Sequence, residues 1–320
     1  MHPATPFGAG ARRVPRGVDG GVTRKEIDVS LDSAKRKLKL LGIFAHPHDC
    51  IHCLGTCGHH VRDGDAVTIA ILTHGGSTHN EKLWREWMKS PEQREQAVMD
   101  ETHEQYVADK KKEVETACGY FGVTDVRMLG YPDRPIRRTD EMVEEVADLI
   151  YAARPDILIT QLPARLDSDR FFAEPEDHST CARIVTEACT LVHHPKPGGA
   201  RGYHRVARKY YIAPSMKYDE VSFFVDISDQ YEKRIKAEMA FVSQGHTPEY
   251  ARRRVERSYG NSGWYARTNL AEKFLTDDIV TVDRLPLTDH DLTLAKDTVY
   301  DEIERLGWTE QEETGTGADS

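Results

Sequence analysis

Residues 38–53 read LKLLGIFAHPHDCIHC, and this stretch decides what the fold can be. Its first eight residues, 38–45, are mainly apolar and have the length of a strand. Three histidines, an aspartate and two cysteines follow within the next eight residues. The stretch therefore predicts a buried strand with a cluster of polar and thiol side chains at its carboxyl end.

Further apolar runs follow this strand and alternate with helical patterns. We expect additional strands at 66–72, 125–130 and 156–160, separated by helices that include 51–62 and a segment capped by Thr139 or Asp140 and stopped at Pro155. Gly122 can end the polar helical stretch 79–120. Later segments predict helices at 179–192, 229–244 and 289–306 and strand-like runs at 207–213 and 221–228. The pattern indicates an α/β fold, a Rossmann-like open and mainly parallel sheet with helices on both faces.

Length and charge restrict the possible classes of protein. The 320 residues fit one large domain, expected at 31–308, between a Gly, Pro and Arg-rich tail at 1–30 and an acidic tail at 309–320. Lys and Arg number 43 against 53 Asp and Glu, a net charge of −10 without a dense basic stripe. We expect no nucleic-acid partner. Without an apolar stretch near the roughly 20 residues needed to cross a bilayer, or an apolar leader, we expect a cytoplasmic protein with no membrane span.

Polar side chains follow each of the first four predicted strands. Because ligands bind outside the carboxyl ends of the strands in an open α/β sheet, these side chains are candidates for a common site. They are His46, His48 and Asp49 after the first strand, Thr73 and His74 after the second, Asp133 after the third, and Arg165, Asp177 and His178 after the fourth. A single residue of this kind is more often a turn former or a cap, and Asp49 could cap the helix near Cys50. Two clusters, HPHD and EDH, at two strand ends favour a site.

The chemistry of these clusters suits a metal. A catalytic zinc takes three His or carboxylate ligands and keeps one open position, and His46, Asp49 and His178 form such a set. One Zn²⁺ is expected, with another divalent ion such as Fe²⁺ as the alternative. Such an ion activates water and polarises a carbonyl, as amide or ester hydrolysis requires.

Three cysteines, Cys50, Cys53 and Cys57, have the spacing C-x2-C-x3-C. That spacing suggests an iron–sulfur or structural zinc site, yet no second CxxC follows. The same positions form one face of a helix packed on a sheet, where Cys behaves as a small apolar residue. We favour a place in the core.

The stretch GIFAHPHDCIHCLGTCGHHVRDGDAVTIAILTHGG resembles the opening of the LmbE-like family, relatives of GlcNAc-phosphatidylinositol de-N-acetylase, whose signature is AHPDD. Further stretches are similar to the family in the same order: KKKEVETACGYFGVTDVRMLGYPD, RPDILIT, EPEDHSTCARIVTEA and VDISDQYEKRIKAEMAFVSQ. The resemblance spans about residues 38–275. It implies a metal-dependent, usually zinc-dependent, deacetylase of N-acetylated amino sugars, with His46, Asp49 and His178 as the ligands.

Two positions depart from the family pattern. His48 stands where the family has the Asp that acts as general base, and Pro175 where it has the histidine thought to stabilise the oxyanion. His48 can still accept a proton, because an imidazole is partly neutral at pH 7, but it could instead become a fourth ligand and close the metal site. The missing oxyanion donor could be replaced by His74, His193, His194 or Arg165.

The sequence thus predicts a zinc-dependent N-deacetylase that acts on a small N-acetylated sugar conjugate. The expected catalytic residues are His48 and Asp177, and the expected substrate-binding residues are Thr73, His74, Asp133 and Arg165. Alternatives are a catalytically silent relative with a binding role, motivated by His48 and Pro175, and a metal hydrolase of another amide or ester. The substrate has no readable code, Trp84 and Trp87 could stack on a sugar or merely pack, and a homo-oligomer is possible.

Overall fold

The structure is a computed structural model that describes residues 36–77, 80–163, 176–196, 198, 201–212 and 216–307. The tails expected at 1–30 and 309–320 lie outside these ranges, and so do Arg165 and Pro175. Within the described ranges, no helix combines the length and apolar character needed to cross a bilayer.

A five-stranded parallel sheet forms the centre of the fold, in the order β3-β2-β1-β4-β5. The strands are β1 (Lys39–Phe44), β2 (Ala66–Thr73), β3 (Asp125–Tyr131), β4 (Ile157–Gln161) and β5 (Arg208–Ile212). The first four were predicted, and the strand-like run 207–213 supplies β5. Because β1 lies between β2 and β4, the residues that follow it reach the middle of the carboxyl edge, where the strand order reverses. The second strand-like run forms β6 (Phe223–Asp226), which pairs antiparallel with β7 (Ala271–Phe274) in a separate small sheet.

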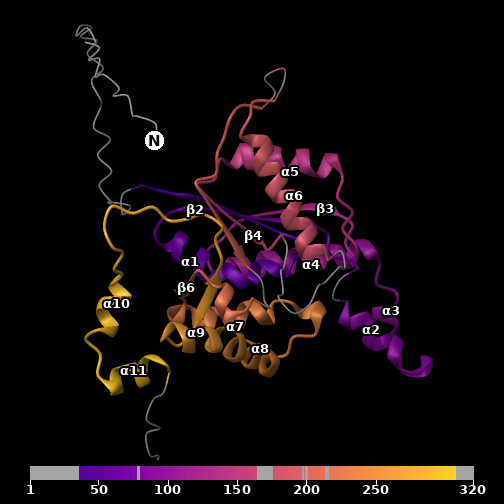
Figure 1. Cartoon of the computed structure of the whole chain (residues 1–320). Helices are drawn as coiled ribbons and strands as arrows, with labels where there is room; N and C mark the ends of the chain where they lie inside the picture. The colour runs from indigo at the N-terminus through magenta and orange to yellow at the C-terminus, as the bar shows by residue number, and fades with distance from the viewer. Residues whose placement is uncertain are drawn as a thin grey trace, which may run out of the picture. The chain divides into compact units, whose positions relative to one another are not determined.

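Helices cover both faces of the sheet, as predicted, because alternate residues of β1 point to opposite sides. Leu40 and Phe44 belong to the core shared with α1 (Leu54–Arg62), α4 (His103–Gly119) and α7 (Tyr231–Met239). Leu41 and Ile43 belong to the core shared with α5 (Asp140–Ala153) and α6 (Asp177–Val192). Figure 1 shows α5 and α6 on one side of the strands and α1 and α7 on the other. The sheet is therefore buried on both faces.

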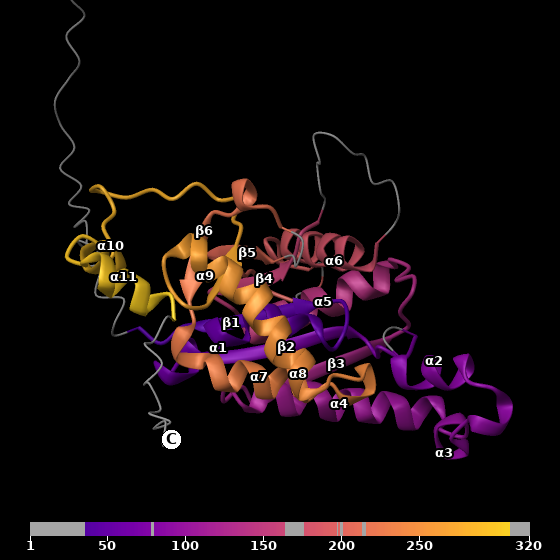
Figure 2. The same ribbon diagram turned by 90° about the horizontal axis from the view of Figure 1, so that it is seen from below.

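Local signals explain several helix ends. Thr139 caps α5 by accepting a hydrogen bond from the Met142 backbone N–H, and the helix ends at Arg154, directly before Pro155. The polar stretch 79–120 forms three helices instead of one, α2 (Glu81–Met88), α3 (Gln96–Met99) and α4, and Gly122 takes a left-handed φ of 79° in the turn after α4. Figure 2 shows α2 and α3 beyond one end of α4.

The carboxyl-terminal part differs from the prediction. The helix expected at 229–244 is shorter, α7 flanked by single 3-10 turns, and the helix expected at 289–306 is two, α10 (Asp289–Leu294) and α11 (Val299–Arg305). Thr298 starts α11 with its own capping box to Asp301, which interrupts the pattern. Two helices that were not predicted from the sequence, α8 (Pro248–Val255) and α9 (Asn261–Ala266), follow α7.

Candidate metal centre

The loop after β1 is closed by Asp49. Its backbone N–H donates to the His46 carbonyl at 3.1 Å, and its carboxylate accepts from the His46 backbone N–H at 2.8 Å. The carboxylate also accepts a hydrogen bond from the side-chain amide of Gln161, at the end of β4, at 2.8 Å. The N-cap of the 3-10 helix Asp49–Cys53 is His48, and Asp49 is the first residue of that helix, so Asp49 does not hold the capping position. Its side chain joins the ends of two neighbouring strands.

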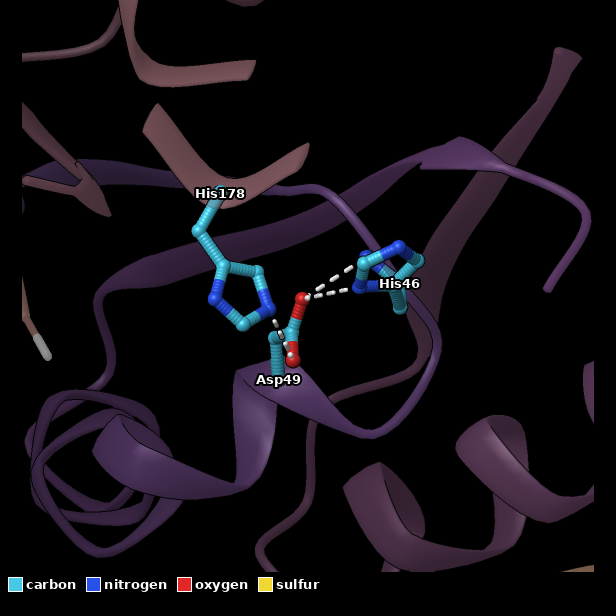
Figure 3. A group of neighbouring side chains, drawn as sticks. All are labelled: His46, Asp49 and His178. Carbon is cyan, nitrogen blue, oxygen red and sulfur yellow. Dashed lines mark hydrogen bonds and ion pairs between the residues drawn. The ribbon is translucent and has the colours of Figure 1, made fainter. Parts of the chain in front are cut away.

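His46, Asp49 and His178 converge as the sequence predicts. The Asp49 carboxylate lies between the two imidazoles, 3.3 Å from His46 Nδ1 and 3.4 Å from His178 Nε2 (Figure 3). His178 comes from the first turn of α6, so strands β1 and β4 both deliver ligands to one point. One potential ligand atom of each residue lies within 4.8 Å of the other two. Two imidazole nitrogens and a carboxylate at this spacing fit a Zn²⁺ ion with an open coordination position.

The electrostatics of this group favour a cation. Burial alone would lower the pKa of His46, but the carboxylates of Asp49 and Asp177 outweigh it and raise that pKa to about 9. His178 likewise has its pKa raised to about 10, because Asp49 and Glu176 outweigh its burial. Asp49 is itself buried, yet the two histidines hold its pKa well below the usual value. Without a metal, protons on the two imidazoles neutralise the negative charge of the carboxylate. A bound dication would neutralise the same charge in their place.

Asp177 lies behind His46 and outside the group of three. Its Oδ2 is 3.0 Å from His46 Nε2, and its carboxylate accepts hydrogen bonds from the backbone N–H groups of Arg134, at 2.9 Å, and Ile136, at 2.7 Å. A carboxylate that binds the far nitrogen of a ligand histidine fixes the orientation of the ring. Asp177, predicted as catalytic, therefore has the position of a residue that orients a ligand.

His48 contacts α7 through its Nε2. Its Nε2 lies 3.4 Å from Glu238 Oε2, and its ring packs edge-on against Phe241 and His246 at centroid distances of 4.6 and 5.4 Å. Burial lowers the pKa of His48 to about 4, although Glu238 acts in the opposite direction. His48 is therefore neutral at neutral pH and able to accept a proton.

A second group of potential ligands consists of His48, Glu238 and His246. Glu238 Oε1 also lies 3.2 Å from Arg254 Nε and 3.5 Å from Arg234 NH2. Two guanidinium groups already neutralise the carboxylate and would repel a dication. The first group of ligands thus suits a metal better than the second.

A pocket of about 490 Å³ lies over both groups. His48, Asp49 and His178 line it, together with residues that the sequence analysis did not single out, namely Glu81, Arg85, Gln244, His246, Tyr250 and Arg254. These residues come from α2, α8 and the segment before α8. No sequence motif connects them with the HPHD cluster.

The predicted substrate-binding residues have structural contacts. Thr73 is fully buried and donates its hydroxyl to the Ala45 carbonyl at 2.8 Å, which links β2 to the loop after β1. Asp133 accepts two hydrogen bonds from the Ser77 backbone N–H, and His74 Nδ1 accepts one from Gly76. None of the three is among the described residues that line the pocket. Arg165 lies outside the described ranges.

Two candidates for the missing oxyanion donor are wrong. His193 and His194 follow the last residue of α6, whereas His178 lies in its first turn. A helix of 16 residues is roughly 24 Å long, so neither imidazole can reach the ligand group. His74 keeps its contact with Asp133, at 3.5 Å, and is the only described member of the four candidates near this end of the sheet.

The cysteine prediction is confirmed. Cys50, Cys53 and Cys57 are fully buried in the core between the sheet and its helices, and all six cysteines are free. The Cys118 thiol and burial raise the pKa of Cys50, and burial and the Cys57 thiol raise the pKa of Cys53. These thiols are protonated packing residues, not ligands.

Several solved structures have this fold. The chain is similar to GalB, the 4-carboxy-2-hydroxymuconate hydratase from Pseudomonas putida KT2440, with 19% identity and a TM-score of 0.61 over 78% of this chain and 100% of that one. The conserved protein TT1542 from Thermus thermophilus has 23% identity and a TM-score of 0.60 over 78% and 100% of the two chains. The N,N'-diacetylchitobiose deacetylase from Pyrococcus horikoshii has 18% identity and a TM-score of 0.56 over 78% and 87%. At these identities the likeness concerns the fold alone.

Residues 41–189 match the family model PIG-L, described as GlcNAc-PI de-N-acetylase. The matched segment begins in β1 and ends in α6, so it contains all three candidate ligands. Residues 41–189 of this chain are thus similar to the PIG-L family.

Proposed function

We propose that the protein is a zinc-dependent N-deacetylase of an N-acetylated amino sugar or sugar conjugate. The observation that carries the proposal is the group of His46, Asp49 and His178, which lies at the carboxyl edge of the sheet inside the segment that matches the PIG-L family model. Ferrous iron is the alternative metal, because imidazole and carboxylate ligands accept it as well.

The described residues divide the work of hydrolysis as follows. His46, Asp49 and His178 would hold the ion, which supplies Lewis-acid chemistry for attack of water on the amide carbonyl. Asp177 keeps the His46 ring in place through its 3.0 Å contact. His48 is neutral, borders the same pocket and accepts the proton of the attacking water. The same proton then passes to the amine nitrogen as the C–N bond breaks, giving acetate and a free amine.

The second candidate is a catalytically silent relative that keeps the fold for binding. The observation in its favour is the direction of His48, whose Nε2 contacts Glu238 and not the ligand group. A third candidate, a metal hydrolase of another amide or ester, uses the same site and differs only in substrate.

Release of acetate from a panel of N-acetylated sugars separates these candidates. We expect the zinc-loaded protein to release acetate from at least one member, and the Asp49→Ala variant to release none. No release by the wild type, together with activity in the His48→Asp variant, would establish the silent relative. Turnover of amides or esters without an acetyl group, and of nothing acetylated, would favour the third candidate.

A further inference from the structure

The contact between His48 and Glu238 joins the loop after β1 to a helix 190 residues further along the chain. Both side chains are almost entirely withdrawn from solvent, since 6% of His48 and 0% of Glu238 is exposed. Glu238 lies on α7, which packs on the same face of the sheet as α1 and α4. The contact is therefore part of the packed interior.

Glu238 is surrounded by positive charge and donors. Arg254 and Arg234 lie at 3.2 and 3.5 Å from its Oε1, and Arg234 is itself 0% exposed. His48 and these guanidinium groups hold the Glu238 pKa below its ordinary value in spite of burial. An ionised carboxylate has no proton to give, so in the 3.4 Å contact His48 Nε2–H is the donor and Glu238 Oε2 the acceptor.

The tautomer of His48 follows from this contact. A neutral imidazole carries one proton, and when Nε2 holds it, the lone pair belongs to Nδ1. His246 is fixed beside the pair, because its Nδ1 donates to the backbone carbonyl of Glu238 at 2.8 Å. The Phe241 ring, edge-on to His48 at 4.6 Å, restricts rotation of the imidazole.

We propose that Glu238 is a positioning residue that holds His48 in the Nε2-protonated tautomer and leaves Nδ1 as the proton acceptor of the reaction. The inference rests on the function proposed above, in which His48 is the general base. In effect, a histidine oriented by a buried glutamate stands where the family has a single aspartate. A carboxylate that selects the tautomer of a catalytic histidine is an arrangement known from other hydrolases.

The kinetic test is a pair of Glu238→Gln substitutions in two backgrounds. With His48 present, the introduced amide can donate as well as accept, so the tautomer is no longer fixed, and we expect kcat to fall about 10- to 1000-fold with KM changed less than about 3-fold. In the His48→Asp background there is no imidazole to orient, and the Glu238 carboxylate would lie beside the carboxylate introduced at position 48. Glu238→Gln removes this repulsion, so kcat should stay equal or rise. Equal losses in both backgrounds would indicate a merely structural role and overturn the proposal.

A matched control separates loss of a buried carboxylate from loss of positioning. Glu272→Gln changes another buried glutamate, 1% exposed, which contacts α1 and not His48. We expect it to lower the unfolding midpoint while leaving kcat within about 3-fold of wild type. Metal content is measured on every variant: loss of one equivalent in Glu238→Gln would make the second group of ligands a metal site and overturn the proposal.

A readout without turnover distinguishes failure of this inference from failure of the proposed function. In ¹⁵N-histidine-labelled wild-type protein at pH 7, the nitrogen shifts of His48, assigned by their absence in His48→Asp, should be those of the Nε2-protonated tautomer. An Nδ1-protonated ring would overturn the inference even if Glu238→Gln failed to fold. The expected tautomer in a protein that releases no acetate would leave Glu238 as the positioning residue and refute only the deacetylase.

Discussion

His46 Nε2 lies 3.0 Å from Asp177 Oδ2, while His46 Nδ1 lies 3.3 Å from Asp49. The two nitrogens of one ring thus face two carboxylates, one in the ligand group and one behind it. Because Asp177 is itself fixed by the backbone N–H groups of Arg134 and Ile136, it determines which nitrogen is available to a metal.

Asp177→Asn should weaken metal binding without unfolding the protein. An amide forms a weaker contact with Nε2 and lowers the basicity of Nδ1, and loss of such an outer carboxylate typically costs about 10- to 100-fold in affinity. Competition with a chelator of known affinity measures the change. The control is Asp229→Asn: the exposed Asp229 carboxylate lies 2.8 Å from Nε2 of His59, a histidine that is not one of the three candidate ligands. Equal affinities in the two variants would contradict the role of Asp177.

His178→Ala and Asp49→Ala should each abolish stoichiometric zinc. Each removes one of three ligands, and two remaining ligands do not hold the ion through dialysis. Elemental analysis of the dialysed proteins gives the metal content. His194→Ala, at the other end of α6, should keep about one zinc per chain as the wild type does. Retention of zinc in both ligand variants would move the site elsewhere.

Glu272→Gln should lower the free energy of unfolding by about 1–3 kcal/mol. The Glu272 carboxylate, on β7, accepts hydrogen bonds from the backbone N–H groups of Gly55 and Thr56 and from the Thr56 hydroxyl, at 2.7 to 2.9 Å. It thereby satisfies backbone donors in the first turn of α1 that have no partner within the helix. A glutamine amide has only one oxygen and can accept only some of these hydrogen bonds. Urea denaturation measures the loss. Exposed Glu232→Gln, on α7, should change stability by less than about 0.5 kcal/mol.

Lys110 should make stability rise in alkaline solution. Burial lowers the pKa of Lys110 from its ordinary 10.5 to about 8, in spite of Glu113 at 4.0 Å. Between these two values the unfolded chain holds a proton that the folded chain has lost, so the unfolding free energy increases with pH, by up to about 1.4 kcal/mol per pH unit. The contribution is complete above the unfolded pKa and disappears as pH falls through the folded one.

Urea titrations of wild type and Lys110→Met at a series of pH values isolate this effect. The difference between the two proteins should grow in favour of the wild type from pH 8 upward. A difference that stays constant with pH would mean that Lys110 keeps an ordinary pKa in the folded protein.

The sequence predicted those parts of the site that depend on strand order. His46, Asp49 and His178 follow β1 and β4, and neighbouring parallel strands end at the same edge, so their convergence needs only the topology. The partner of His48 could not be found in this way. Glu238 reaches His48 through the packing of α7 on the sheet, and no periodicity marks one glutamate of an amphipathic helix as the buried one.

Substrate binding by Thr73 and Asp133 stays a prediction. Both follow strands at the expected edge, and the structure shows hydrogen bonds from both side chains to backbone groups of adjacent loops. A hydroxyl or carboxylate at a strand end can satisfy the chain as readily as a ligand, and only the direction of the side chain distinguishes the two. The break between α10 and α11 was not predicted, because the hydrogen bonds between Thr298 and Asp301 that start α11 are seen only in the structure.

Because all six cysteines are buried and free, their reactivity toward a thiol reagent can measure local unfolding of the core. A thiol reagent reaches a sulfur only when the core around it opens, so the rate of labelling reports how often that part of the protein unfolds locally. Cys50, Cys53 and Cys57 follow the β1 loop, whereas Cys181 and Cys189 lie on α6 beyond His178. Labelling rates measured for each cysteine with and without added zinc would therefore show whether a bound ion stabilises the β1 loop and the start of α6 against local unfolding.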